Sequence, residues 1–254
     1  MCSVYPCRMC GRYAQSAQMR DLIEQFEVTG VAPQEALPQN WNIAPTNEIY
    51  IIRSSAFNGG DALSRDLTTL SWGLIAPWLK DENEAKISQS RAINARSESI
   101  HKKPTFRDAF RRTRCLIPAE GYYEWATALG AYSPKQPFYI SSENGKQLSI
   151  AGIWSSWQSP EGTLIESASV ITREAVGELA TIHSRMPVMM PRDRWDAWLN
   201  PQERDIPTLQ NLMVLEKPDA NLVARPVSSD VNSVANTGER LTRAITLGEP
   251  ETLF

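Results

Sequence analysis

The feature that most restricts the fold is a close succession of short apolar segments in the middle of the chain. These strand-like runs cover residues 114–118, 121–125, 137–142, 147–154 and 163–172. Helical patterns near 104–112, 173–181 and 192–199 do not alternate with the strands as they would in a parallel sheet. We therefore expect an α+β domain with an antiparallel or mixed, barrel-like sheet core flanked by helices.

The N-terminal third of the chain predicts one helix and one hairpin. Residues 16–28 have the pattern of an amphipathic helix. Its predicted apolar face consists of Leu22, Ile23 and Phe26. Residues 30–47 are rich in Pro, Asn and Gln and predict a loop, whereas 48–54 and 68–75 predict strands on either side of a turn at 59–61. The end of the chain, from Ser233, is expected to be loosely structured.

Composition excludes several classes of protein. The 254 residues carry a net charge of −3, and no linker divides them, so a single domain is expected. No run approaches the roughly 18 apolar residues of a membrane helix, and residues 1–8 lack the apolar stretch of a signal peptide. Four cysteines are too few for a disulfide scaffold, which favours a reducing cytoplasm, with nucleoid association in a bacterium. With only two histidines, we expect no metal site and no cofactor.

The four cysteines predict different roles. Cys7 and Cys10 form a C-x-x-C pair, but no second pair follows, and a redox motif would need a strand before it and a helix after it. We therefore do not expect metal or redox chemistry there. Cys115 lies in an apolar run and is expected to be a small buried side chain.

Cys10 directly follows Met9, and methionine is easily removed before a small residue such as cysteine. Translation from Met9, followed by removal of the methionine, would leave Cys10 with a free α-amine. The amine (pKa about 7.7–8.0) and the thiol (pKa about 8.5) lie on adjacent carbons. Together they condense with an aldehyde, first as a Schiff base and then as a five-membered thiazolidine ring. The alternative is an incidental cysteine near a terminus.

Three other residues could assist such a nucleophile. Asn94 and Arg96 are two apart, so on an extended strand they share a face. Glu124 lies in an aromatic, apolar strand, where burying a charged carboxylate costs free energy unless the group is paired or takes part in acid–base chemistry. The alternative is that Glu124 points outward from an edge strand. His183, with Arg185 beside it, is the remaining acid–base candidate, although a lone histidine is more often structural.

A set of longer motifs resembles the SOS-response-associated peptidase (SRAP) family. The matching segments are MCGRYAQ, WNIAPT, SWGLIAPW, INARSES, CLIPAEGYYEW, AGIW, VITREA, IHSRMPV and PVSSDVN. They run in order from Cys10 to about Asn236, nearly the whole chain. The resemblance implies a single domain over 10–236, an extension at 1–9 that is absent from or removed in the mature protein, and a tail at 237–254.

The resemblance implies a sensor of abasic sites in single-stranded DNA that crosslinks to them. In this interpretation Cys10 forms a thiazolidine with the ring-opened sugar aldehyde. Asn94 holds the linkage by a hydrogen bond, Glu124 shuttles protons and orients the amine, and His183 protonates the sugar oxygen as the ring opens.

The resemblance also implies a groove for single-stranded DNA. Trp72 and Trp78, with Pro45 and Pro77, would line it by base stacking; the alternative for the two tryptophans is core packing. The whole predicted DNA-binding set is Arg12, Asn42, Pro45, Trp72, Pro77, Trp78, Arg96, Thr172 and Arg185. The chain has 19 arginines and 7 lysines, and arginine suits phosphate because of its planar fork, although genomic GC bias would also explain the excess.

Residues 101–114 carry six Lys or Arg and one Asp, a local charge of +5. The segment is either a solvated helix face or a contact to the DNA backbone. The predicted partner is single-stranded DNA with abasic sites; replication-fork proteins are candidates, a membrane is not, and a monomer is expected.

Residues 1–8, which precede Met9, conflict with the proposed nucleophile because they would tie up the amine of Cys10 in an amide. A start of translation at Met9, or self-processing by the family's peptidase activity, would remove the conflict. Cys2 is a weaker substitute because it lacks the Gly-Arg that follows Cys10. Two other functions stay open: a cysteine peptidase that acts on other proteins, and a non-catalytic reader of modified bases. Strand cleavage by β-elimination is a further expected side activity.

Overall fold

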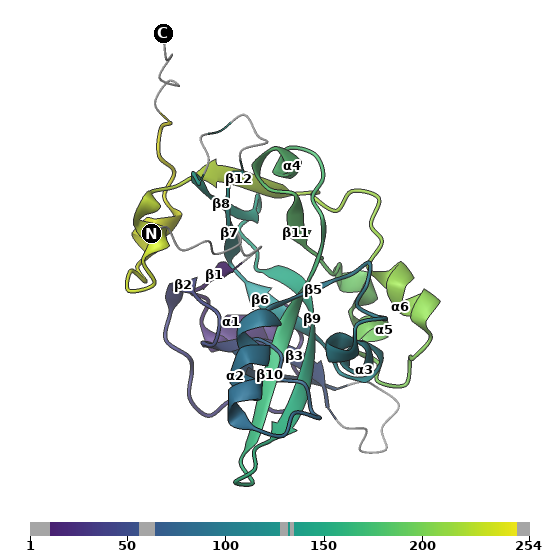
Figure 1. Cartoon of the computed structure of the whole chain (residues 1–254). Helices are drawn as coiled ribbons and strands as arrows, with labels where there is room; N and C mark the ends of the chain where they lie inside the picture. Colours follow the sequence, from purple (N-terminus) through teal and green to yellow (C-terminus); the bar gives the residue numbers. More distant parts are fainter. Residues whose placement is uncertain (1–10, 56–63, 128–131, 133–134, 248–254) are drawn as a thin grey trace.

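Two long strands, β9 (Leu148–Gln158) and β10 (Leu164–Glu174), form the hairpin around which the fold is organised. The computed structural model describes residues 11–55, 64–127, 132 and 135–247, and every element below lies within these ranges. The first half of β10 pairs with β9 on one side. Each of the two strands also pairs with further strands, which closes the sheet (Figure 1).

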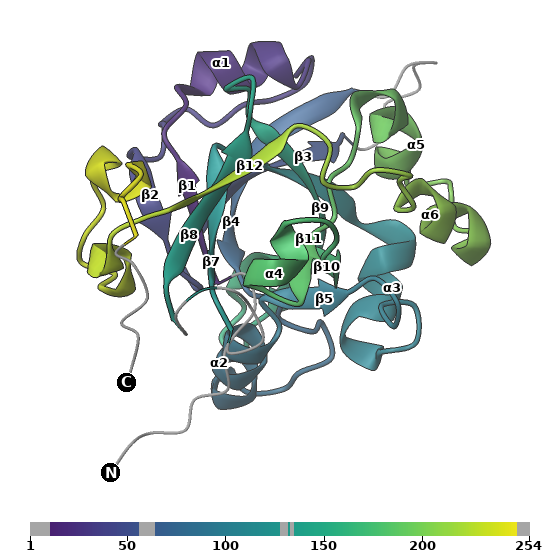
Figure 2. The same ribbon diagram turned by 90° about the horizontal axis from the view of Figure 1, so that it is seen from above.

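Five strands close into a barrel. β3 (Glu48–Ser54) pairs antiparallel with both β4 (Arg65–Trp72) and β6 (Arg114–Ala119), and β6 pairs antiparallel with β9. The ring closes where β4 runs parallel to β10, with Ser71 opposite Ser167. Figure 2 shows the strands arranged in a ring when the molecule is seen from above. The predicted α+β fold with a mixed, barrel-like core is therefore confirmed.

Alternation along the barrel strands separates an inner from an outer core. In β3, Ile49 and Ile51 face the barrel interior, whereas Tyr50 and Ile52 belong to the cluster under the helices outside. Because both faces are buried, these strands read as nearly continuous apolar runs rather than as alternating ones. This explains why their positions could be predicted from sequence.

A second, five-stranded antiparallel sheet packs against the barrel. Its strands are, in order, β12 (Leu222–Pro226), β8 (Pro137–Ser142), β7 (Gly121–Trp125), β1 (Arg12–Gln15) and β2 (Asn40–Ile43). Tyr13 and Tyr122 face the barrel core. The opposite face carries Tyr123 and Tyr139, packed against Leu241 of the C-terminal segment.

The C-terminal segment corrects one expectation. The 3-10 helices η2 (Ser229–Asn232) and η3 (Glu239–Thr242) cover the outer face of the small sheet, and Ala244 bridges to Val227. Leu241 is fully buried. The prediction of a loosely structured end from Ser233 is therefore wrong for the packed residues up to Ala244.

Two short strands continue the sheet along the second half of β10. β5 (Asn94–Arg96) runs parallel to it, with Asn94 opposite Val170, and β11 (Arg185–Pro187) runs antiparallel on the other side, with Arg185 opposite Glu174. The helical pattern near 173–181 is wrong for its first part, because β10 extends to Glu174 to pair with β11.

Helices pack around the barrel and over one of its ends. These are α1 (Met19–Gln25), α2 (Glu82–Arg91), α3 (Pro104–Arg112), α4 (Leu179–Ile182), α5 (Trp195–Leu199), α6 (Ile206–Leu212) and the 3-10 turn η1 (Arg192–Arg194). The bounds of α3 match the prediction, and Pro104 starts it at a position that needs no N–H donor. Among the described residues, none of these helices is long and apolar enough to cross a membrane.

Candidate active site

A buried carboxylate and a buried imidazole meet at one end of the barrel. Glu124 of β7 lies on the same strand face as Tyr122 and is 3% exposed, and His183 follows the last residue of α4 and is 4% exposed. Glu124 Oε2 and His183 Nδ1 are 3.7 Å apart. The Thr127 N–H donates to the Ile182 carbonyl at 3.0 Å, which ties the end of β7 to the end of α4. β7, α4 and β11 lie side by side in Figures 1 and 2.

Hydrogen bonding sets the protonation of His183. Nδ1 lies 3.1 Å from the Arg185 backbone N–H and 3.3 Å from the Arg185 carbonyl oxygen; in the neutral tautomer that accepts the shorter bond from the N–H, the ring proton is on Nε2. Burial, and then the charge of Arg185, lower the pKa of His183, while the nearby Arg185 carbonyl acts in the opposite direction. The imidazole is therefore neutral at pH 7.

Arg185 is itself buried, and both of its terminal guanidinium nitrogens are hydrogen-bonded. Its guanidinium donates to both carboxylate oxygens of Glu98, at 2.7 and 3.0 Å, and to the carbonyl of Thr172 at 2.7 Å. Burial favours the protonated form of Glu98, but the hydrogen bonds and charge of Arg185 outweigh it and lower the pKa of Glu98. The Arg185 guanidinium, which we expected to bind a phosphate, is thus already bound to the Glu98 carboxylate.

Asn94 lies on β5, next to the same end of the barrel. The preceding residue, Ile93, accepts hydrogen bonds at its carbonyl from the indole N–H of Trp72 and from the Val170 N–H, both at 3.0 Å. Asn94 is half-buried and Arg96 is exposed. The extended conformation that we predicted for this pair is confirmed.

The start of the described chain enters β1 beside Glu124. Arg12 pairs with Tyr123, the neighbour of Glu124, and the preceding Gly11 is buried. Cys10, which is bonded to Gly11, lies outside the described residues. Strand alternation puts the half-buried Arg12 on the face of Tyr123, opposite to Glu124, and burial lowers the pKa of Arg12.

Besides Arg185, three residues of the predicted DNA-binding set have buried side chains. Trp72 is 1% exposed and contacts Tyr13 edge-on at 5.4 Å, so it connects β1 to β5 instead of stacking on a base. The amide of Asn42, also 1% exposed, donates to the carbonyls of Val231, Ser233 and Asn236. Thr172 is fully buried, and its carbonyl accepts from Arg185. These side chains support the fold.

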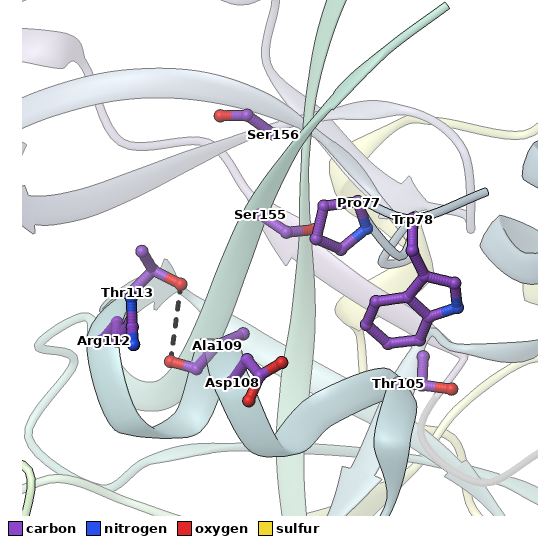
Figure 3. Close-up of a pocket in the computed structure, with 9 residues that line it drawn as sticks. All are labelled: Pro77, Trp78, Thr105, Asp108, Ala109, Arg112, Thr113, Ser155 and Ser156. Carbon is purple, nitrogen blue, oxygen red and sulfur yellow. Dashed lines mark hydrogen bonds between the residues drawn. The ribbon is translucent and has the colours of Figure 1, made fainter. Parts of the chain in front are cut away.

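Other members of the set form an open surface. Pro77 and Trp78 border a hollow of about 360 Å³ between the loop after β4 and helix α3, and Trp78 is 48% exposed (Figure 3). The opposite wall comes from α3 and includes Asp108 and Arg112. Pro45 is half-buried, in the turn after β2.

The basic segment 101–114 divides into two parts. Lys102, Lys103, Arg107, Arg111 and Arg112 are exposed. Arg114 is buried and donates to the carbonyls of Phe110, Trp198, Asn200 and Glu203. Burial lowers its pKa to about 10, so it remains charged at neutral pH. Arg114 is therefore neither part of a solvated helix face nor available to the DNA backbone, because it links α3 to α5.

Sequence reasoning missed Glu98. It belongs to the segment INARSES and follows Arg96 by two residues. Its only signal in the sequence was this spacing, which on an extended strand would put it on the same face as Asn94 and Arg96. Its partner Arg185 is 87 residues away in the sequence.

The barrel with a buried acid–base pair at one end defines the class of protein. A sequence model of the SOS response associated peptidase (SRAP) family matches residues 9–234. The chain belongs to this family.

Named relatives agree with this assignment, and a solved structure shares the fold. The chain is 36% identical over 236 residues to "Abasic site processing protein YoqW" of Bacillus subtilis, covering 92% of this chain and 98% of that protein. It is 30% identical over 265 residues to "Abasic site processing protein HMCES" of Mus musculus, covering 90% and 74%. A crystal structure of a protein from Bacteroides thetaiotaomicron superimposes with a TM-score of 0.78 at 23% identity, covering 93% of this chain and 100% of that one.

Proposed function

We propose that this protein processes abasic sites in single-stranded DNA by forming a covalent thiazolidine link through Cys10. One observation carries the proposal: Glu124 and His183 are buried 3.7 Å apart, and Glu124 follows the partner of Arg12, where β1 begins two residues after Cys10. The names of relatives at 30–36% identity support the choice of substrate.

The chemistry begins at the aldehyde of the ring-opened abasic sugar. The α-amine of Cys10 attacks the aldehyde carbon to give a carbinolamine, which loses water to form a Schiff base. The thiol then adds to the imine carbon; the new C–S bond closes the ring, and the thiol proton passes to the nitrogen. One aldehyde and one aminothiol thus give one thiazolidine and one water, with no oxidant or reductant.

The neighbouring side chains fit the proton transfers of these steps. A neutral His183 with its proton on Nε2 can donate to the sugar oxygen as the ring opens. Glu124 shuttles protons between amine, carbinolamine and water and orients the amine. Asn94, at the edge of the same site, holds the linkage by an amide hydrogen bond. If ring closure is slow, β-elimination from the Schiff base cleaves the strand.

A free amine on Cys10 requires that no peptide bond precede it. Translation from Met9 followed by methionine removal provides this. Self-processing is the other route: hydrolysis of the Met9–Cys10 bond consumes one water and leaves a carboxylate on Met9 and the amine on Cys10. Cys2 is the weaker candidate because Gly-Arg does not follow it.

The strand itself is bound by the open surface. Trp78, with Pro77 and Pro45, offers stacking surface, and Arg96 and the exposed cations of α3 offer phosphate contacts. Arg12 and Arg185 lie nearer to the acid–base pair. Arg185 must leave Glu98 before it can bind a phosphate.

The test is incubation with a single-stranded oligonucleotide that carries one abasic site. The wild-type protein should give a denaturant-stable adduct whose mass equals the sum of both components less one water, with the link on Cys10. Cys10→Ala should give none, while Glu124→Gln should slow the adduct about 100-fold. An adduct from Cys10→Ala, or an intact mass that places the mature N-terminus elsewhere than Cys10, would overturn the proposal. Hydrolysis of unrelated peptides without any adduct would favour a peptidase.

A further inference from the structure

We propose that Glu98 is a positioning residue for His183, acting through Arg185. Glu98 anchors the arginine whose backbone N–H binds the imidazole, and it balances the arginine's charge. The catalytic meaning of this assignment rests on the proposed function, since His183 is its acid. No step described above uses Glu98.

The anchor is a two-pronged ion pair. Both guanidinium nitrogens of Arg185 bind Glu98, at 2.7 and 3.0 Å, and one of them also binds the Thr172 carbonyl of β10. Such parallel bonds fix orientation as well as distance. The guanidinium is 9% exposed and the carboxylate is about half exposed, so one partner is held in the protein and the other remains accessible from the surface.

The anchor bears on His183 because β11 is short. Arg185 is the first of only three residues in β11, and it lies opposite Glu174 on β10. Its backbone N–H is the group that donates to His183 Nδ1 at 3.1 Å. A strand of this length has few backbone bonds to hold its first residue, so the side-chain bonds to Glu98 and Thr172 fix the position of that N–H. They thereby fix the tautomer that leaves the proton on Nε2.

Charge provides the second link. Among the described residues, the charged groups at His183 are Glu124 from β7 and Arg185 from β11, and Glu98 reaches Arg185 from the loop after β5. The positive charge of Arg185 lowers the proton affinity of the imidazole. The carboxylate of Glu98 offsets that charge. Without the Glu98 carboxylate, the charge of Arg185 next to His183 is no longer offset, and the pKa of the imidazole falls further.

The chain allows this to be measured without any DNA. It has two histidines, so His101→Gln leaves His183 as the single imidazole. In this background, NMR titration should show the His183 midpoint at lower pH in Glu98→Gln than in the parent, with loss of the Nε2–H tautomer as the dominant neutral form. Glu174→Gln is the matched control, because its exposed carboxylate makes no ion pair with the described residues.

A second variant separates charge from geometry. Glu98→Asp keeps the charge but is one methylene too short for both bonds. Its titration midpoint should stay at the parent value while its crosslinking rate on abasic single-stranded DNA falls about tenfold. Glu98→Gln should lower the crosslinking rate by a similar factor and should also shift the pH at which the rate falls on the acidic side of its pH profile.

The outcomes are decisive in each case. An unchanged His183 titration in folded Glu98→Gln, or a shift of equal size in Glu174→Gln, overturns the proposal. If Glu98→Gln does not fold, a shifted midpoint in Glu98→Asp overturns it and an unshifted midpoint with a reduced rate supports it. If the wild-type protein forms no adduct, the proposed function fails, but the titration and tautomer still decide whether Glu98 positions His183.

Discussion

The barrel end that contains Glu124 and His183 differs sharply from the face that contains Trp78 and α3. At the barrel end, the Glu124 carboxylate, the His183 imidazole and the Arg185 guanidinium are all at least nine-tenths buried; the imidazole lies 3.7 Å from the carboxylate and contacts the Arg185 backbone. At the open face, Trp78 is half exposed and the cations of α3 extend into solvent. The first region has a fixed protonation state, and the second has accessible apolar and positive surface.

This difference shows that two residues of the same type in the same motif can have different roles. Trp72 and Trp78 stand six positions apart in SWGLIAPW, yet one packs between β1 and β5 and the other borders the hollow by α3. The buried region is arranged for proton transfer and the open region for holding a strand. Substitutions should therefore affect stability and chemistry in the first region but only DNA affinity in the second.

The largest effect on stability is expected from Trp72→Ala. It removes a fully buried indole and leaves the Ile93 carbonyl short of a donor, so the free energy of unfolding should fall by about 3–5 kcal/mol. Denaturant titration measures this. The matched Trp78→Ala should change the unfolding free energy by less than about 0.5 kcal/mol. Equal losses in the two variants would contradict the division between the regions.

Trp78→Ala should instead weaken binding of an intact single-stranded oligonucleotide. Loss of one stacked base costs about 1–3 kcal/mol, which corresponds to a Kd about 5- to 150-fold higher. Trp78→Phe, which keeps an aromatic face, should recover most of the affinity. Fluorescence anisotropy with a labelled oligonucleotide provides the measurement, and an unchanged Kd in Trp78→Ala would remove this face from the binding surface.

A smaller effect should separate two neighbouring arginines of α3. Arg112 borders the hollow beside Trp78, whereas Arg111, equally exposed, does not. If the strand passes along the hollow, Arg112→Gln should reduce the slope of log affinity against log salt by about 0.7, the value for one phosphate of a single strand. Arg111→Gln should leave the slope near that of the wild type. A larger change for Arg111 would move the strand to the outer side of α3.

The smallest effect is expected in the pH dependence of stability. Because the pKa of His183 is lower in the folded state than its ordinary 6.5, the unfolded chain binds more protons below that pH. Stability should therefore be complete above about pH 6.5 and decline as the pH falls towards 5. His183→Gln should flatten this decline in thermal unfolding measured across the range. A decline that is the same in both proteins would show that other groups cause it.

The parts of the fold that sequence could predict are those whose pattern is local. The hairpin of β3 and β4 and the helix α3 follow from apolar periodicity within about ten residues. β1, β2, β5 and β11 have only three or four residues each, too few for a period, and they exist because distant strands pair with them. The segment 30–47, predicted as a loop, contains β2 for this reason.

The site shows the same limit. Residue chemistry alone identified Glu124 and His183, because a carboxylate in an apolar strand is unusual and histidines are scarce. Residue type did not distinguish a buried Trp72 from an exposed Trp78. Nor could it pair Glu98 with Arg185, since β10 brings together the segments that carry them.

The position of β1 in the middle of the small sheet has a consequence for biosynthesis. The strand lies between β2 and β7, and the Gln15 side chain binds the Pro118 carbonyl, 103 residues further along. Such distant pairings form slowly and only once both partners exist. In a chain leaving the ribosome, the proposed nucleophile emerges before β7 and α4 have been made. The chain gains the imidazole next to Glu124 only after residue 183 has been added, so truncated products lack a complete centre.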